Sequence, residues 1–183
     1  MKTTIWSWNV NGLRAVLKKD FITTINRENI DIIGLQETKL QEHQIPEELE
    51  ELSQYHQYWS HAERKGYSGT ALFSKVKPIS FETAFGVEEF DTEGRINIAE
   101  YEQFILMNIY FPNGGQGDER LAYKLRFYDK ALEVMQAKRA SGKAILVAGD
   151  YNTAHKEIDL ARPKENEEVT GFLPIERAWL DKI

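Results

Sequence analysis

The chain has 183 residues, 42% of them apolar, so it is long enough to bury the core of one compact domain. It has no cysteine, which excludes disulfides, cysteine-bound zinc and a thiol nucleophile. The net charge of -6 argues mildly against a nucleic-acid partner, although much of the acid lies in two runs, 41–51 and 82–93, that we expect to be solvated surface. The amino-terminal stretch turns polar too soon for a signal peptide or a membrane span, so we expect a soluble, cytoplasmic protein.

The first fifty residues predict strands followed by helices. Residues 3–10 alternate between β-branched or aromatic and polar residues, which predicts a strand that ends at the Asn11-Gly12 turn. Apolar residues at helical spacing predict a helix over 13–25, and the apolar run 30–35 predicts a buried strand. A short helix with proline in its first turn is predicted over 46–52.

The middle of the chain predicts successive short strands, at Tyr58 and over 70–74, 79–84, 96–101 and 104–110. From Asp118 the period becomes helical, with one apolar stripe made of Leu121, Leu125, Tyr128, Leu132 and Met135. The run 144–148 predicts another buried strand, and a final helix is predicted from Pro174. Clusters of strands and helices, rather than strict alternation, indicate an α/β layered sandwich whose sheets are partly antiparallel.

Three predicted strands end in carboxylate or carboxamide groups, in the segments Trp8-Asn9-Val10-Asn11, Leu35-Gln36-Glu37-Thr38 and Gly149-Asp150-Tyr151-Asn152. Layered α/β folds build their sites at strand ends. Convergence of these ends would form an all-oxygen cluster, which suits a hard cation such as magnesium. The cluster would contain Asn9, Glu37, Asp150 and Asn152.

Asp150 and Asn152 are two residues apart, so in an extended segment both side chains leave on the same face and can address one substrate. The alternative is that they only close a turn after the strand, with their side chains bonded to nearby backbone amides. One such segment alone favours the turn, whereas three segments at three strand ends favour a site.

Two further features are weak signals. The loop 110–115 carries two glycines that let backbone amides approach a phosphate, but an isolated loop of this kind is more often a plain turn. No histidine pair has helical metal-ligand spacing, and no Gly-x-Ser-x-Gly elbow is present. His155 follows Asn152 closely, but a histidine bonded within its own loop is a more frequent case than a catalytic one.

Six ordered segments resemble the signature segments of the exonuclease III and AP endonuclease family, part of the endonuclease, exonuclease and phosphatase superfamily. They are Trp8-Asn9-Val10-Asn11-Gly12-Leu13-Arg14-Ala15, Leu35-Gln36-Glu37-Thr38-Lys39, Gly66-Tyr67-Ser68-Gly69, Glu93-Gly94-Arg95, Tyr110-Phe111-Pro112-Asn113 and Gly149-Asp150-Tyr151-Asn152-Thr153-Ala154-His155. Six collinear motifs make a specific signal, whereas single ones also occur in lipid phosphatases and deadenylases of the superfamily.

The resemblance implies a four-layer α/β sandwich of two packed mixed sheets with outer helices. It implies a reaction that depends on Mg2+, or on Mn2+ as a substitute, with Glu37 and Asn9 at the metal and Asp150 and Asn152 close enough to bind it. It also implies that Asp150 activates the attacking water and that Asn152 orients this water or stabilises the charged transition state. Tyr110 would contact the scissile phosphate.

By the same resemblance the substrate is double-stranded DNA, cut beside an abasic site or degraded from its 3′ ends during base excision repair. The residues implied to grip the DNA backbone are Arg14, Lys39, Tyr67, Arg95, Asn113 and Arg120. Each has a simpler interpretation, because an exposed cation usually serves solubility and Tyr67 could belong to the core.

Family members continue past the position of Ile183 through an aspartate and a Ser-Asp-His segment, so we expect a single domain over 1–183 that is incomplete at its carboxyl end. A sheet without its final strands would expose an apolar edge, which predicts low stability or self-association. The leading hypothesis is a DNA repair nuclease, and the alternative is a truncated DNA-binding fragment without catalysis. An enzyme acting on another phosphodiester is disfavoured by the segments at Tyr67 and Tyr110.

Overall fold

The computed structural model describes residues 2–183, which form two compact units. Unit 1 contains the residues up to Tyr110 together with Lys138–Asp150, and unit 2 contains Phe111–Ala137 together with Tyr151–Ile183. None of the helices described for residues 2–183 has both the length and the hydropathy of a membrane span. The expectation of a single domain stays a prediction.

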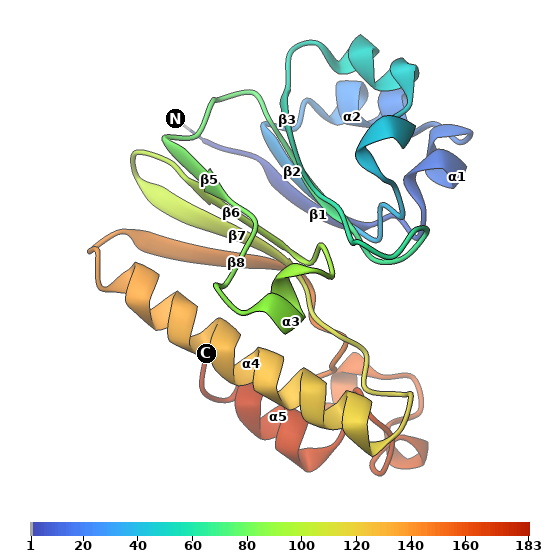
Figure 1. The fold of residues 1–183 in the computed structure, drawn as a ribbon, viewed down its shortest axis with the longest axis vertical. Helices are drawn as coiled ribbons and strands as arrows, with labels where there is room; N and C mark the ends of the chain where they lie inside the picture. Colours follow the sequence, from blue (N-terminus) through green and yellow to red (C-terminus); the bar gives the residue numbers. More distant parts are fainter. Residues whose placement is uncertain (1) are drawn as a thin grey trace. The chain divides into compact units, whose positions relative to one another are not determined.

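Unit 1 is built on two four-stranded sheets (Figure 1). The first has the order β1-β2-β4-β3, with strands Ile5–Asn9, Ile32–Gln36, Thr70–Ser74 and His56–Ser60. The second has the order β5-β6-β7-β8, with strands Ser80–Glu82, Ile96–Glu100, Phe104–Tyr110 and Ala144–Asp150. Each sheet combines one parallel pair, β1 with β2 or β7 with β8, with antiparallel pairs, so both sheets are mixed.

Short helices accompany the strands of unit 1, namely α1 (Leu13–Leu17), α2 (Phe21–Glu28), α3 (Glu88–Asp91) and the 3-10 helices η1 (Glu42–Gln44) and η2 (Glu47–Leu52). Most of the long helix α4 (Asp118–Arg139) belongs to unit 2, together with η3 (Glu157–Asp159), η4 (Pro163–Glu165) and α5 (Pro174–Leu180). Figure 1 shows α5 beside α4.

The side chains of the first sheet alternate between two apolar layers. Ile33 of β2 and Phe73 of β4 belong to a buried cluster that includes residues of α1, α2 and η2. Ile32 and Leu72, one position along each strand, belong to a second cluster with Leu106 of β7. The first sheet is therefore covered by helices on one face and by the second sheet on the other.

Two predicted helices form differently from the expectation. The helix expected over 13–25 is wrong as a single element, because α1 ends at Leu17 and a turn leads to Asp20, whose ψ of 35° lies outside the helical region, before α2 begins. The helix expected over 46–52 forms as the 3-10 helix η2, and Pro46 precedes its first residue as the N-cap.

β8 is not the buried strand that was expected over 144–148. Its residues are exposed or half-buried along the whole strand, and Leu146 is 43% exposed. Within residues 2–183 the strand pairs with β7 and with no other strand, so it forms one edge of the second sheet. An apolar run cannot by itself distinguish a central strand from an edge strand.

The buried face of α4 also differs from the expected stripe. Its buried residues are Tyr123, Lys124, Phe127, Tyr128, Ala131 and Met135, whereas Leu121, Leu125 and Leu132 are only half-buried. Aromatic packing inside unit 2 accounts for part of this shift, because the rings of Phe127 and Tyr128 lie 5.6 and 5.5 Å from the ring of Phe111. Edge-to-face contacts of this kind favour the aromatic side of the helix over its leucines.

Candidate active site

The ends of three strands bring together Asn9 of β1, Glu37 directly after β2 and Asp150 of β8, all in unit 1. The Nδ2 atom of Asn9 donates one hydrogen bond to Oε1 of Glu37, at 2.8 Å, and another to Oδ2 of Asp150, at 2.7 Å. One amide thus bridges two carboxylates that are 113 residues apart in sequence, from 37 to 150. The predicted convergence is confirmed for these three residues.

Tyr110 joins this cluster through the sheet register. β7 and β8 are parallel and pair Tyr110 with Asp150 at their carboxyl ends. From there the hydroxyl of Tyr110 donates to Oε1 of Glu37 at 3.0 Å. Parallel strands end at the same edge of a sheet, and this is why Tyr110 and Asp150, from separate sequence motifs, lie side by side.

A buried polar bridge between the sheets fixes the strand that carries Glu37. The Nε2 atom of Gln36, which is 1% exposed, donates to Oδ1 of Asn108 on β7 at 2.5 Å. The Nδ2 atom of Asn108 donates in turn to the carbonyl of Leu35 at 3.2 Å and to Oδ1 of Asn97 at 2.9 Å. Buried amides bonded to one another in this way favour a single register of the two sheets, although Nδ2 of Asn97 has no hydrogen-bond partner among residues 2–183.

The surroundings of Glu37 and Tyr110 keep the carboxylate of Glu37 charged and the hydroxyl of Tyr110 protonated. Burial alone would raise the pKa of Glu37, but hydrogen bonds from Asn9, Lys39 and Tyr110, together with the charge of Lys39, outweigh burial and lower this pKa. Burial, followed by the charge of Glu37 and the hydrogen bond to it, raises the pKa of Tyr110 well above the ordinary value. At neutral pH, Glu37 is therefore an acceptor and Tyr110 a donor.

Left-handed backbone conformations occur at three of the predicted site residues. Glu37, Lys39 and Asn152 have φ angles of 56°, 55° and 49°, although none of them is a glycine. Such conformations cost about 1–3 kcal/mol each and persist where the surrounding structure imposes them. Gly149, directly before Asp150, has a φ of 133°, and a Cβ atom there would overlap the carbonyl oxygen of Ile109.

The donor set of unit 1 fits a hard cation. Glu37 and Asp150 offer carboxylate oxygens, and no histidine takes part. Asn9 directs its Nδ2 atom at both carboxylates, while its Oδ1 atom accepts from the amide of Asn11. Among residues 2–183, no group of three or more His, Cys, Asp or Glu side chains is arranged to hold a metal ion. A cation that keeps several waters and takes other oxygens from its substrate, as magnesium does, needs no larger protein set.

Asn152 lies in unit 2, so its predicted place in the metal cluster stays a prediction. Its Nδ2 atom donates to the carbonyl of Phe111 at 2.8 Å, and Nδ2 of Asn113 lies 3.4 Å from its Oδ1 atom. Its own carbonyl accepts a hydrogen bond from Nζ of Lys124 at 2.8 Å. The loop that carries Asn152 is therefore tied to its unit by both side chain and backbone.

The sequence analysis missed the residues that anchor this loop. Nζ of Lys124 and Oε1 of Glu176 form an ion pair at 2.6 Å in which both side chains are 0% exposed. Lys124 also donates to the hydroxyl of Thr153 at 2.9 Å, and Oε2 of Glu176 accepts from the backbone amides of Gly171 and Leu173. Lys124 lies three residues after Leu121 and four before Tyr128, at the edge of the predicted stripe, and only its charge led us to expect it on the polar side.

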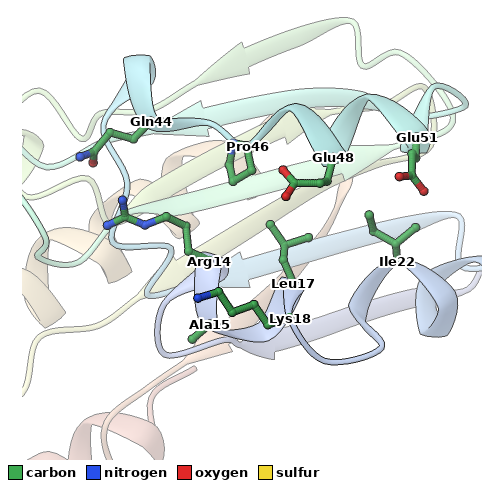
Figure 2. Close-up of a pocket in the computed structure, with 9 residues that line it drawn as sticks. All are labelled: Arg14, Ala15, Leu17, Lys18, Ile22, Gln44, Pro46, Glu48 and Glu51. Carbon is green, nitrogen blue, oxygen red and sulfur yellow. The ribbon is translucent and has the colours of Figure 1, made fainter.

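Two of the residues expected to grip DNA, Arg14 and Lys39, differ in their surroundings. Arg14 on α1 is exposed and, with Lys18, lines a hollow of about 900 Å³ opposite Glu48 and Glu51 of η2 (Figure 2). Nζ of Lys39 lies 3.0 Å from Oε2 of Glu37 and donates to the side chain of Asn11 at 2.5 Å. The glutamates of the acidic run 41–51 are exposed as expected, and two of them lie beside Arg14. The expectation is wrong for part of the run 82–93, because Asp91 accepts from the backbone amides of Phe85 and Val87, and Glu93 pairs with the buried Arg95.

The remaining members of the DNA-binding set also differ in exposure. Arg95 is buried, with its side chain 2% exposed, and it contacts Tyr67, which is half-buried. In unit 2, the guanidinium of Arg120 lies over the ring of Tyr123 at 4.1 Å, and Asn113 is exposed. The role of all six residues at DNA stays a prediction.

The two weak signals have structural counterparts in unit 2. The side chain of Asn113 accepts a hydrogen bond from the amide of Gly115 at 2.7 Å, which closes the glycine loop as a turn. Nε2 of His155 lies 2.7 Å from Oδ1 of Asp181, and its backbone amide donates to Asp159. His155 thus bonds beyond its own loop, to a carboxylate just past α5.

Comparisons with known proteins agree with this geometry. The sequence profile of the Endonuclease/Exonuclease/phosphatase family matches residues 6–181. The chain is 45% identical over 172 residues to "Exodeoxyribonuclease" of Bacillus subtilis, covering 93% of this chain and 67% of that protein. It is 41% identical over 181 residues to "DNA repair nuclease APEX1" of Danio rerio, covering 98% of this chain and 58% of that protein.

Solved structures support the fold. An AP endonuclease from Archaeoglobus fulgidus superimposes with a TM-score of 0.86 at 25% identity, over 99% of this chain and 69% of that one. A 3′-5′ exonuclease from Neisseria meningitidis gives a TM-score of 0.85 at 26% identity, over the same shares of the two chains. The predicted α/β fold of two mixed sheets with helices is confirmed, and the chain spans about two thirds of these structures.

Proposed function

Because the chain belongs to the Endonuclease/Exonuclease/phosphatase family, we propose that it acts in DNA repair as a nuclease that hydrolyses DNA phosphodiesters with Mg2+. The proposed substrates are duplexes with an abasic site and the 3′ ends of duplex DNA. The observation that carries the proposal is the Asn9 amide that joins Glu37 to Asp150, with the Tyr110 hydroxyl on the same carboxylate.

Members of this family are metal-dependent nucleases, and we propose magnesium, with manganese as a substitute, as the metal here. Glu37 would hold it, with Asn9 and Asp150 beside it and Asn152 close by. When bound, the metal would neutralise charge on the phosphate oxygens during hydrolysis. Glu37 suits this role because its lowered pKa keeps it ionised.

The protein groups divide the rest of the reaction among them. Asp150 accepts the proton of the attacking water, since it is the second carboxylate of the cluster and its neighbour Asn9 fixes its orientation. Tyr110, which stays protonated, would turn its one O–H donor from Glu37 to the scissile phosphate when DNA is bound. Asn152 orients the water or stabilises the charged transition state, and its loop is held in place by Lys124.

DNA recognition rests on the cations and amides named above. We propose that the exposed Arg14, Lys39 at the cluster, and Asn113 and Arg120 of unit 2 contact the DNA backbone, together with Tyr67. Arg95, the sixth residue of the expected set, is buried. An abasic sugar has no base to unstack, so turning it out of the duplex costs little and favours such sites.

The proposal includes a cytoplasmic location, which suits a protein without cysteine, and self-association through the exposed edge of β8.

A second candidate function is DNA binding without catalysis. Only two carboxylates meet at the site within residues 2–183, and a lysine lies 3.0 Å from one of them. This observation favours a protein that occupies abasic DNA and leaves the phosphodiester intact.

One assay separates the two candidates. Purified protein is incubated with duplex DNA that carries an abasic analogue, first with Mg2+ and then with EDTA. Nicking that needs the metal and disappears in Asp150→Ala, but persists in the exposed control Asp129→Ala, is the expected result. Binding of the duplex without nicking in the native protein would instead establish the second candidate.

A further inference from the structure

Arg95 lies where its guanidinium is enclosed by protein. The side chain is 2% exposed, and each of its nitrogens has a protein partner. Nε lies 2.5 Å from Oε2 of Glu93, Nη1 donates to the carbonyl of Tyr110 at 3.1 Å, and Nη2 donates to the hydroxyl of Tyr67 at 2.7 Å. Three of its five N–H donors are bonded to protein, and a side chain that is 2% exposed presents little of the guanidinium to a DNA phosphate.

The same guanidinium also packs on two rings. Its central carbon lies 4.7 Å from the ring centroid of Tyr110 and 5.5 Å from that of Tyr67, which is within the range of a cation–π contact. Arg95 therefore holds Tyr110 by both its carbonyl and its ring. The hydroxyl of Tyr110 is the group that reaches Glu37.

The backbone places Arg95 against Tyr110 as well. The amide of Tyr110 donates to the carbonyl of Arg95 at 2.9 Å, next to the paired residues of β6 and β7. Gly94 has a φ of 61°, and a Cβ atom there would overlap the backbone of His61 and Ala62. The turn before Arg95 thus needs a glycine, and it directs the arginine inward.

From these contacts we propose that Arg95 is a positioning residue, which orients the Tyr110 hydroxyl toward Glu37 and fixes Tyr67, and does not grip a DNA phosphate itself. This role differs from the contact with the DNA backbone that the family resemblance implies for Arg95. Its effect on turnover rests on the proposed nuclease function, whereas its effect on the two tyrosines does not.

The test uses Arg95→Met, which keeps an unbranched apolar side chain and removes the guanidinium with its donors. The matched control is Arg27→Met on α2, an arginine whose side chain is 67% exposed. Affinity for an abasic duplex is measured in EDTA at several salt concentrations. The binding constant falls as the salt concentration rises, and loss of one phosphate contact makes the slope of log K against log salt shallower by about 0.9. We expect Arg95→Met to have the native slope.

Turnover and tyrosine signals complete the test. We expect kcat to fall about tenfold or more with KM unchanged, because the loss concerns an interaction made in the transition state. Arg95→Lys should not restore kcat, since one ammonium cannot replace a fork that serves three partners. In protein labelled with 13C-tyrosine, the ring signals of Tyr67 and Tyr110 should move in Arg95→Met and stay in place in Arg27→Met.

The double variant Glu93→Gln/Arg95→Met guards against misfolding, because it removes the charge left behind on Glu93. It should show the same slope, kcat and ring shifts as the single variant. A slope shallower by about 0.9, full recovery of kcat in Arg95→Lys, or unmoved tyrosine signals would each overturn the proposal. If the native protein does not nick DNA, the proposed function fails, and the ring signals still decide the role of Arg95.

Discussion

Two of the lysine–glutamate pairs among residues 2–183, one in each unit, have opposite surroundings. Lys39 and Glu37 in unit 1 lie 3.0 Å apart with side chains 35% and 20% exposed. Lys124 and Glu176 in unit 2 lie 2.6 Å apart with both side chains 0% exposed. Water can solvate either charge of the first pair when its partner leaves, whereas no solvent reaches the charges of the second pair.

This difference in exposure suits Lys39 and Glu37 to a site that binds ligands, and it suits Lys124 and Glu176 to holding a loop in place. A glutamate whose cation is partly solvated can exchange that cation for a metal ion at small cost. A buried glutamate that has lost its cation is left as an uncompensated charge. The first pair can therefore separate when a substrate or metal binds. The second pair fixes the loop of Asn152, because Lys124 donates to the carbonyl of Asn152.

The largest expected effect comes from breaking the buried pair. Lys124→Met should lower the free energy of unfolding by about 3–5 kcal/mol, because Glu176 is left charged and buried. Urea unfolding followed by the fluorescence of Trp179, which stacks on Tyr128, measures the loss. The double variant Lys124→Met/Glu176→Gln should regain part of it. A single variant as stable as the native protein would contradict the anchoring role.

The next effect concerns catalysis. Glu37→Gln keeps the size of the side chain and removes its charge, so it should lower kcat/KM on an abasic duplex by about a hundredfold or more. The exposed Glu50→Gln on η2 is the control and should match the native enzyme. Equal activity of Glu37→Gln and native protein would exclude Glu37 from the metal site.

A smaller effect is expected from Lys39→Met. Stability should change by less than about 1 kcal/mol, since exposed ion pairs contribute little. The pKa of Glu37 should rise, because both the hydrogen bond and the charge of Lys39 lower it. Calorimetric titration with Mg2+ should show tighter binding, as one competing cation is gone. Weaker binding would mean that Lys39 supports the metal site.

The smallest effect is a pH dependence at the surface of unit 2. Hydrogen bonds from His155 and Lys156 lower the pKa of the exposed Asp181 below its ordinary value. A lowered folded-state pKa stabilises the fold above the unfolded value, near 4, and this contribution disappears as the pH falls through the folded value. Unfolding midpoints of native protein and Asp181→Asn should therefore differ slightly at pH 6 and coincide at strongly acidic pH. A difference that grows toward acid would contradict this assignment.

Local sequence patterns predicted most of the strands well. The bounds expected for β4 and β7, 70–74 and 104–110, are those observed. Gly69 and Lys75 flank the first run, and Gln103 and Pro112 limit the second. The convergence of Asn9, Glu37 and Asp150 was also predictable, since each follows an apolar run. The family expectation is confirmed by the relatives.

Features set by distant partners could not be predicted. The position of β8 at a sheet edge depends on which strands pair with it, and its apolar run is the same in either position. Lys124 is indistinguishable from a surface lysine until Glu176, 52 residues further along the chain, closes over it. The inward direction of Arg95 depends on a turn at Gly94 that packs on residues 61–62.

The left-handed residues Glu37, Lys39 and Asn152 have a consequence for directed evolution. Glycine adopts this conformation without strain, so replacement at each position would relieve about 1–3 kcal/mol, against about 0.5–1 kcal/mol of lost chain entropy. A library selected only for heat resistance should accumulate glycine at 37, 39 and 152. A library selected for DNA cleavage should retain the side chains, so these positions mark where the two selections diverge.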